Sequence, residues 1–163
     1  MKKLIIILAL AMPMLAGAQK YGHINTQELF QLMPELKTVQ GKLDSLNKQY
    51  ETLLMQMQEE YKTKLKEYQN QAATLPDVIK QSKEDELVSM QERLQATYQT
   101  AQQDVDQKQR EWIAPIHEKM AKAIQKVGAD KGFTYIFDTA ATLYVGTDAT
   151  DVMPDVKKEL GIK

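Results

Sequence analysis

Residues 36–57 read LKTVQGKLDSLNKQYETLLMQM, and apolar or tyrosine side chains recur there after alternating steps of three and four residues. After a slip of one residue the pattern continues to Leu75, with a mean step of about 3.5 residues, the period of a coiled coil. The stripe comprises Leu36, Val39, Leu43, Leu46, Tyr50, Leu53, Met57, Tyr61, Leu65, Tyr68, Ala72 and Leu75. This spacing predicts a long amphipathic helix that packs lengthwise against a second helix.

A second long helix is expected after the turn Thr74-Leu75-Pro76-Asp77, because proline stops the first helix there. The sequence has no glycine between Gly41 and Gly128. Pro115 should kink the second helix, and Gly128 and Gly132 should end it. Its stripe comprises Ile79, Leu87, Met90, Leu94, Tyr98, Ala101, Val105, Trp112, Ile116, Met120, Ala123 and Val127. Two such helices must form an antiparallel hairpin, and residues 36–127 are therefore predicted to be a helical arm.

The flanking residues, 19–35 and 128–163, predict a small body that contains β-structure. Residues 20–24 suit a short strand, and Asn25 with Glu28 has the spacing of a capping box at a helix start. Residues 133–137 and 142–145 are rich in aromatic and β-branched side chains, which predicts two strands of a hairpin. Pro154 and Gly161 should begin and end a last helix. The predicted fold class is α+β, mostly α.

The predicted body is too small for a stable core of its own, since it has only about fifty residues. Its second strand carries bulky side chains on both faces, and strands of that kind need cover on both sides. We therefore expect subunits to associate through this body. The residues expected to build the oligomerisation body are Ile24, Phe133, Tyr135, Ile136, Phe137, Leu143, Tyr144 and Val145.

The first eighteen residues predict a secretory signal peptide. Lys2 and Lys3 precede the apolar run Leu4–Leu15, and Ala16-Gly17-Ala18 offers small side chains to a signal peptidase. The alternative, an uncleaved anchor, needs more apolar residues than about twelve to span a bilayer. Cleavage after Ala18 is expected to release an exported chain of residues 19–163 without stable membrane insertion.

Composition and motif spacing argue against an enzyme and against nucleic-acid binding. The chain has no cysteine, a net charge of −1, and no glycine-rich phosphate loop. His23 and His117 are expected to be structural or exposed, since no histidine pair has the spacing of a metal site. Asp104 and Asp106 would point about 200° apart on a helix, so they cannot share a site. We expect no catalytic residues, metal or cofactor.

A binding surface is the remaining candidate, and the apolar residues around the tip of the arm supply one. Leu53-Leu54-Met55 is an apolar triplet, and a two-helix seam cannot bury all three side chains. Around the tip, Glu67 and Asp77 are outnumbered by the lysines at 62, 64, 66, 80 and 83. Apolar patches flanked by lysines would hold an unfolded chain weakly at many points. The candidate client-binding residues are Leu54, Met55, Met57, Tyr61, Leu65, Tyr68, Leu75, Val78, Ile79 and Met90.

The chain resembles the Skp/OmpH family of periplasmic chaperones across residues 19–163. The segments that carry the resemblance are Tyr21–Leu29, Trp112–Ile116, Ala123-Ile124, Ala129–Phe133, Leu143–Val145 and Asp151-Val152. The resemblance implies a homotrimer whose helical arms enclose a cavity. It further implies that the cavity shields unfolded outer-membrane proteins in the periplasm without ATP.

Two readings of function stay open at this point. One is the chaperone; the other is a structural envelope spacer, or an adaptor that docks a folded partner through its helical hairpin. Members of the family are often basic, whereas this sequence has a pI near 6.1. Contact through apolar side chains should therefore matter more here than electrostatic capture, and peripheral lipid contact stays open.

Overall fold

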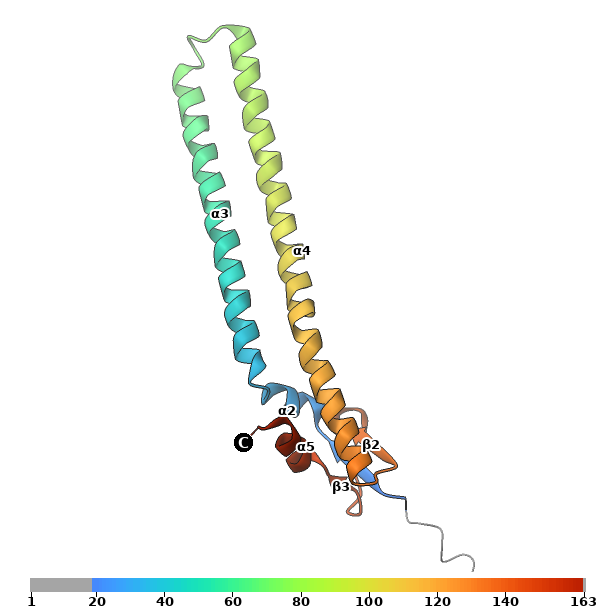
Figure 1. Ribbon diagram of the computed structural model, residues 1–163. Helices are drawn as coiled ribbons and strands as arrows, with labels where there is room; N and C mark the ends of the chain where they lie inside the picture. Colours follow the sequence, from blue (N-terminus) through green and yellow to red (C-terminus); the bar gives the residue numbers. More distant parts are fainter. Residues whose placement is uncertain (1–18, 163) are drawn as a thin grey trace, which may run out of the picture. The chain divides into compact units, whose positions relative to one another are not determined.

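The computed structural model describes residues 19–162, and Figure 1 shows how its helices and strands follow one another. The predicted signal peptide therefore lies outside the described residues. The described chain divides into two compact units. We call Pro34–Ile116 the hairpin unit, and residues 19–33 with 117–162 the sheet unit. The elements are β1 (Tyr21–Ile24), α2 (Thr26–Gln31), α3 (Glu35–Gln71), α4 (Asp77–Asp130), β2 (Tyr135–Asp138), the 3-10 turn η2 (Thr139–Ala141), β3 (Thr150–Asp151) and α5 (Met153–Leu160).

The hairpin unit consists of α3 and the first part of α4, which lie side by side and antiparallel (Figure 1). Cross-helix hydrogen bonds fix the register: Gln91 bonds Tyr61, and seven residues farther along α3, Tyr68 bonds Glu84, seven residues back along α4. The turn between the helices contains Pro76, as predicted. The predicted fold class, mostly α with a long helical hairpin and a small β-containing body, is confirmed.

Helix α4 runs past its predicted glycine stop. It includes Pro115 and continues through Gly128 to Asp130. The prediction that Gly128 ends the helix is wrong, because this glycine serves a packing role: a Cβ there would lie 3.2 Å from Cδ1 of Ile136. Gly132 is the true stop, since its φ of +65° is a left-handed conformation that suits glycine.

The sheet is three-stranded and parallel, with the order β2-β1-β3. The predicted hairpin of residues 133–137 and 142–145 is therefore wrong. After β2, the carboxylate of Asp138 accepts from the backbone N–H of Ala140 at 3.0 Å, which turns the chain into η2. Residues 142–145 form no strand, and the side chain of Leu143 is fully exposed. The side of β1 that does not face β2 pairs with β3 instead.

The core of the sheet unit joins β1, α2, the end of α4 and α5. Its buried side chains are Ile24, Leu29, Met33, Met120, Ala123, Val127, Val152 and Val156. Burial of each large aliphatic side chain contributes roughly 1.5–3 kcal/mol. Asn25 caps α2 by accepting from the N–H of Glu28 at 3.0 Å, as the predicted capping box requires. At the start of helix α5, the carboxylate of Asp151 accepts from the backbone N–H of Met153 at 2.9 Å. Gly161 ends this helix.

Candidate functional site

The seam between α3 and α4 uses Leu54 rather than the predicted Leu53. Leu54 is half-buried between Tyr50 and Met57 in the stripe, whereas the side chain of Leu53 is 42% exposed. Spacing favours Leu53, because a step of four residues from Tyr50 to Leu54 directly follows another step of four and breaks the alternation. The structure departs from the spacing at this position. On α4, Ile79 and Tyr98 were also assigned to the stripe, and both are exposed.

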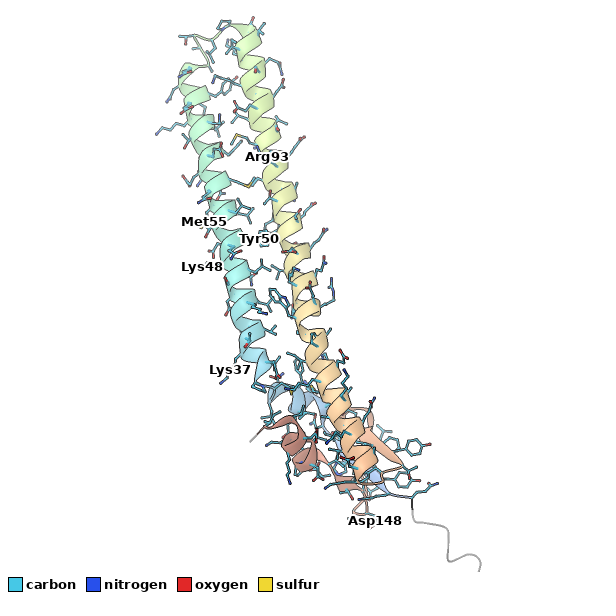
Figure 2. The ribbon with its side chains drawn as sticks, in the orientation of Figure 1. Lys37, Lys48, Tyr50, Met55, Arg93 and Asp148 are labelled. Carbon is cyan, nitrogen blue, oxygen red and sulfur yellow. The ribbon has the colours of Figure 1, made fainter. Side chains whose placement is uncertain are left out.

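The candidate client-binding residues fall into two groups. Met55, Val78 and Ile79 are exposed, with Met55 at 58% and Val78 at 80%. Met55 projects from α3 in the middle of the hairpin unit (Figure 2), while Val78 and Ile79 lie in the first turn of α4. The other candidates are half-buried along the two helices or, for Leu75, in the turn between them: Leu54, Met57, Tyr61, Leu65, Tyr68, Leu75 and Met90.

Three exposed apolar or aromatic side chains of the hairpin unit were absent from the candidate set: Leu53, Val88 and Tyr98. Val88 carries a usable signal, because it directly follows the buried Leu87 and successive side chains of a helix point about 100° apart. The same argument applied to Leu53 and Leu54 predicted that one of the triplet must face outward. The hairpin unit thus presents apolar side chains from both helices.

Polar contacts cross the seam at intervals along the hairpin unit. The Tyr50 hydroxyl donates to the Asp104 carboxylate at 3.0 Å, and Lys64 pairs with Glu86 at 2.6 Å. Hydrogen bonding to Asp104, together with burial, raises the pKa of Tyr50. The pKa of Glu86 is lowered by its hydrogen bond with Lys64. A seam that alternates apolar and polar layers fixes register at modest stability.

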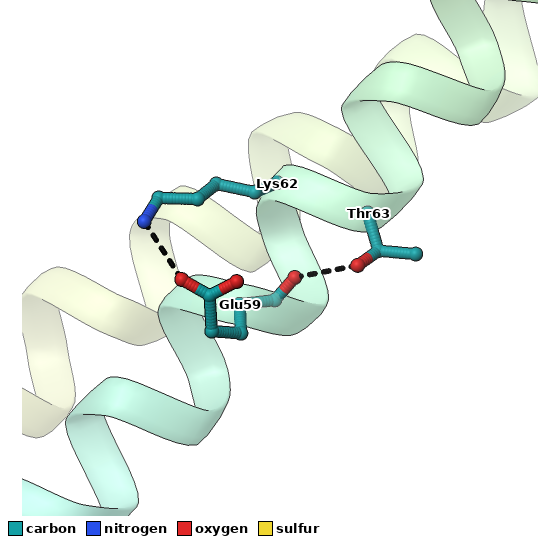
Figure 3. A network of polar contacts seen from close by, with 3 residues as sticks. All are labelled: Glu59, Lys62 and Thr63. Carbon is teal, nitrogen blue, oxygen red and sulfur yellow. Dashed lines mark hydrogen bonds and ion pairs between the residues drawn. The ribbon is translucent and has the colours of Figure 1, made fainter.

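The lysines near the tip are partly neutralised. Lys62 lies 2.8 Å from Glu59, whose backbone oxygen also accepts from Thr63 (Figure 3). Lys64 pairs with Glu86, and Lys80 lies 3.7 Å from Asp77. Exposed pairs of this kind contribute little to stability or binding, and salt screens them. Apolar contact is therefore the stronger contribution that this surface can make to binding.

A second candidate surface is an aromatic face on the sheet unit. The parallel register sets Tyr21 beside Tyr135, and their rings stack with centroids 6.3 Å apart. Phe137 stacks on both at 6.4 and 5.8 Å. All three side chains are exposed, and they lie on β1 and the edge strand β2. The alternate residue Ile136 is half-buried on the opposite face, beside Gly22 and Gly128.

The other predicted body residues take several positions. Ile24 is buried, and Phe133 is half-buried with the Lys20 ammonium 4.2 Å from its ring centroid. Val145 is half-buried, whereas Leu143 and Tyr144 are exposed on the loop that follows η2. Exposed aromatic and aliphatic groups gathered on one small unit are typical of an interaction site.

The described part of the chain offers neither a metal site nor a membrane-spanning helix. Residues 19–162 contain no group of three or more His, Asp or Glu side chains that could hold a metal ion. They also contain no helix that is both long and apolar enough to cross a bilayer. His23 is half-buried in β1, and the exposed His117 stacks on Phe30 with ring centroids 4.8 Å apart.

Comparisons with known proteins agree on one family. The family model described as outer membrane protein (OmpH-like) matches residues 20–160. The chain is 26% identical over 153 residues to the chaperone protein Skp of Yersinia enterocolitica, covering 94% of this chain and 93% of that protein. It is 30% identical over 142 residues to the Vibrio cholerae chaperone protein Skp, covering 78% and 76%. A crystal structure of an OmpH-like protein from Caulobacter crescentus shares the fold, with a TM-score of 0.74 at 15% identity over 88% of this chain and 85% of that one.

Proposed function

The chain belongs to the OmpH-like outer membrane protein family, a family of chaperones without enzymatic activity, and on this premise we propose that it is an ATP-independent periplasmic holdase. It holds unfolded outer-membrane β-barrel proteins and prevents their aggregation. Its near full-length similarity to proteins named chaperone protein Skp supports this proposal. The alternative, an envelope spacer or adaptor, would bind one folded partner.

The observation that carries the proposal is the apolar surface of the hairpin unit. Met55, Val78 and Ile79 are exposed to solvent on the two helices of the hairpin unit. Leu53 and Val88 add to this surface. Unfolded β-barrel chains expose alternating apolar residues that would otherwise pair with one another. Scattered apolar contacts of roughly 1 kcal/mol each capture such a chain and still release it without an energy source.

The proposed assembly is a homotrimer, in which helical arms enclose the client. The aromatic face of Tyr21, Tyr135 and Phe137 supports self-association, because these side chains are exposed and stacked on a small sheet. Strand β2 is also an edge, with one row of backbone groups available for pairing. The predicted signal peptide, residues 1–18, would deliver the chain to the periplasm.

The test is suppression of aggregation by mature protein, residues 19–163. A urea-unfolded outer-membrane β-barrel protein is diluted into buffer with or without the chaperone, and light scattering follows aggregation. The triple variant Met55→Ser, Val78→Ser, Ile79→Ser should need several-fold more protein for the same suppression. The matched control Gln56→Ser, Gln69→Ser, Gln71→Ser changes three exposed polar side chains of α3 and should behave as wild type. Equal suppression by both variants would count against the proposed apolar surface.

A further inference from the structure

A groove opens between α3 and α4 in the middle of the hairpin unit, away from the turn. Its volume is about 910 Å³, within the range of small-ligand sites in proteins. Tyr50, Leu54 and Met55 line it from α3, and Tyr98, Ala101 and Val105 line it from α4. Figure 2 shows Tyr50 and Met55 near one another on α3.

The groove exists because the seam is thin there. Ala101 occupies a seam position where Leu94 and Ile116 stand elsewhere on α4, and its small side chain is buried to 7% exposure without filling the gap. The Tyr50 hydroxyl spans to Asp104 at 3.0 Å and holds the two helices together across this stretch. Met55 and Tyr98, both largely exposed, line the groove where it meets solvent.

The charged lining of the groove is entirely acidic. Glu51 lines it from α3 and Asp106 from α4, and the described residues that line it include no Lys, Arg or His. Asp104, which accepts the hydrogen bond of the Tyr50 hydroxyl, is a third carboxylate near the groove. An apolar floor beside carboxylates complements a ligand that presents apolar groups flanked by cations.

We propose that this groove binds extended segments of an unfolded polypeptide in which apolar residues alternate with lysine or arginine. The proposal rests on the proposed holdase function and names a second, chemically selective contact for its client. One apolar side chain would enter between Tyr50 and Ala101, and the flanking cations would meet Glu51 and Asp106. The surface around Val78 and Ile79, by contrast, has lysines nearby and lacks this preference.

The first test measures binding of two labelled peptides to mature protein by fluorescence anisotropy. One nine-residue peptide alternates Leu, Val or Tyr with Ser and Lys, and its partner carries Glu in place of every Lys. The Lys peptide should bind about fivefold more tightly at low salt, since each exposed ion pair adds little. The preference should shrink at about 0.5 M salt, where charges are screened. Equal binding of the two peptides at low salt would overturn the proposal.

Two variants locate the binding. Ala101→Phe fills the groove and should weaken Lys-peptide binding at least tenfold, while Ala96→Phe makes the same change at an exposed position of α4 and should not. Glu51→Gln with Asp106→Asn should abolish the preference for Lys over Glu. Its matched control, Glu60→Gln with Glu92→Gln, removes two exposed carboxylates outside the groove and should keep the preference. Circular dichroism of each variant checks that the hairpin forms.

The outcomes separate this inference from the holdase proposal. If the Ala101→Phe variant loses peptide binding but still suppresses aggregation, the groove proposal is supported. Other apolar contacts then account for the remaining suppression. Ala101→Phe that binds the peptide like wild type overturns the groove, whatever its chaperone activity. A wild-type protein that binds the Lys peptide but fails to suppress aggregation keeps the groove and removes the holdase function. If Ala101→Phe does not fold, the charge variant decides: an unchanged peptide preference there overturns the proposal.

Discussion

The hydroxyl of Tyr50 on α3 donates a hydrogen bond to the carboxylate of Asp104 on α4 over 3.0 Å. Both side chains are half-buried, and the bond lies where the apolar seam is thinnest. In this stretch the polar bridge spans a groove between the two helices. The bond therefore combines two tasks: it fixes the register of the hairpin and leaves apolar surface open beside it.

Replacing Tyr50 by phenylalanine removes this bond and keeps the ring. We expect Tyr50→Phe to lower the free energy of unfolding by about 0.5–1.5 kcal/mol, the usual net value of one hydrogen bond. Thermal unfolding followed by far-ultraviolet circular dichroism measures the change. Tyr98→Phe is the matched control, because Tyr98 is exposed. Identical melting curves for the two variants would show that the bridge contributes nothing to stability.

The hydrogen bond between Tyr50 and Asp104 also makes the stability of the hairpin unit sensitive to high pH. Asp104 raises the pKa of Tyr50, and Glu84 raises that of Tyr68. A raised pKa in the folded state means that the stabilisation is complete below the ordinary tyrosine pKa of about 10 and disappears as pH rises through the folded value. In an ultraviolet absorbance titration, these two tyrosines should ionise last. The double variant Tyr50→Phe, Tyr68→Phe should lack the late phase; its persistence would assign it to other tyrosines.

Two glycines should respond in opposite directions to the same substitution. A Cβ on Gly22 would lie 3.0 Å from Val152, 3.1 Å from Phe133 and 3.2 Å from Ile136. Gly22→Ala should therefore cost about 1–3 kcal/mol by overpacking the sheet unit. Gly41 lies in α3 with open space around it, so Gly41→Ala should gain about 0.5–1 kcal/mol from helix propensity. Urea unfolding measures both, and a stabilising Gly22→Ala would contradict the packing described.

Acid should weaken the sheet unit through Asp138. Its carboxylate accepts from the Thr26 hydroxyl and from the N–H of Ala140, and the Thr26 bond is the main cause that lowers its pKa. A lowered pKa means that the stabilisation is present above the ordinary aspartate value and is lost as pH falls through the folded one. Asp138→Asn should thus cost most at neutral pH and progressively less in acid. Asp148→Asn, at an exposed loop position (Figure 2), is the matched control for the loss of one aspartate.

Self-association should depend on the aromatic face. Tyr135→Ser with Phe137→Ser removes two exposed rings from β2 and should shift the protein toward monomers, measured as molar mass by light scattering. Val88→Ser removes an exposed apolar group from the hairpin unit and should leave the mass unchanged. A double variant that keeps the wild-type mass would move the subunit interface elsewhere.

The sequence period was sufficient to predict the helices of the hairpin, because a stripe repeated over many turns leaves one arrangement that buries it. The individual side chains that occupy the seam were predicted less well. The alternation favours Leu53, yet Leu54 is the half-buried side chain and Leu53 is exposed. The stripe of α4 also continues without a break past Ile116, so its period does not mark where one unit ends.

The pairing of the strands could not be predicted from the local sequence pattern. Residues 142–145 have good strand propensity, yet β1 pairs with β2 and β3, which come from distant parts of the chain. The groove was missed for a related reason: a run of weak seam residues predicts poor packing, and only the facing side chains turn that weakness into a lined cavity. The limited room in a two-helix seam predicted that part of the triplet Leu53-Leu54-Met55 faces outward, and Leu53 and Met55 are exposed.

Molar mass of the mature chain, residues 19–163, measured by light scattering alone and after mixing with a urea-unfolded outer-membrane β-barrel protein, tests the central claim most directly. The account predicts a particle of three subunits that takes up one client when the urea is diluted. An oligomer that keeps its own mass while the client precipitates would contradict it, and would favour a spacer or an adaptor with a folded partner.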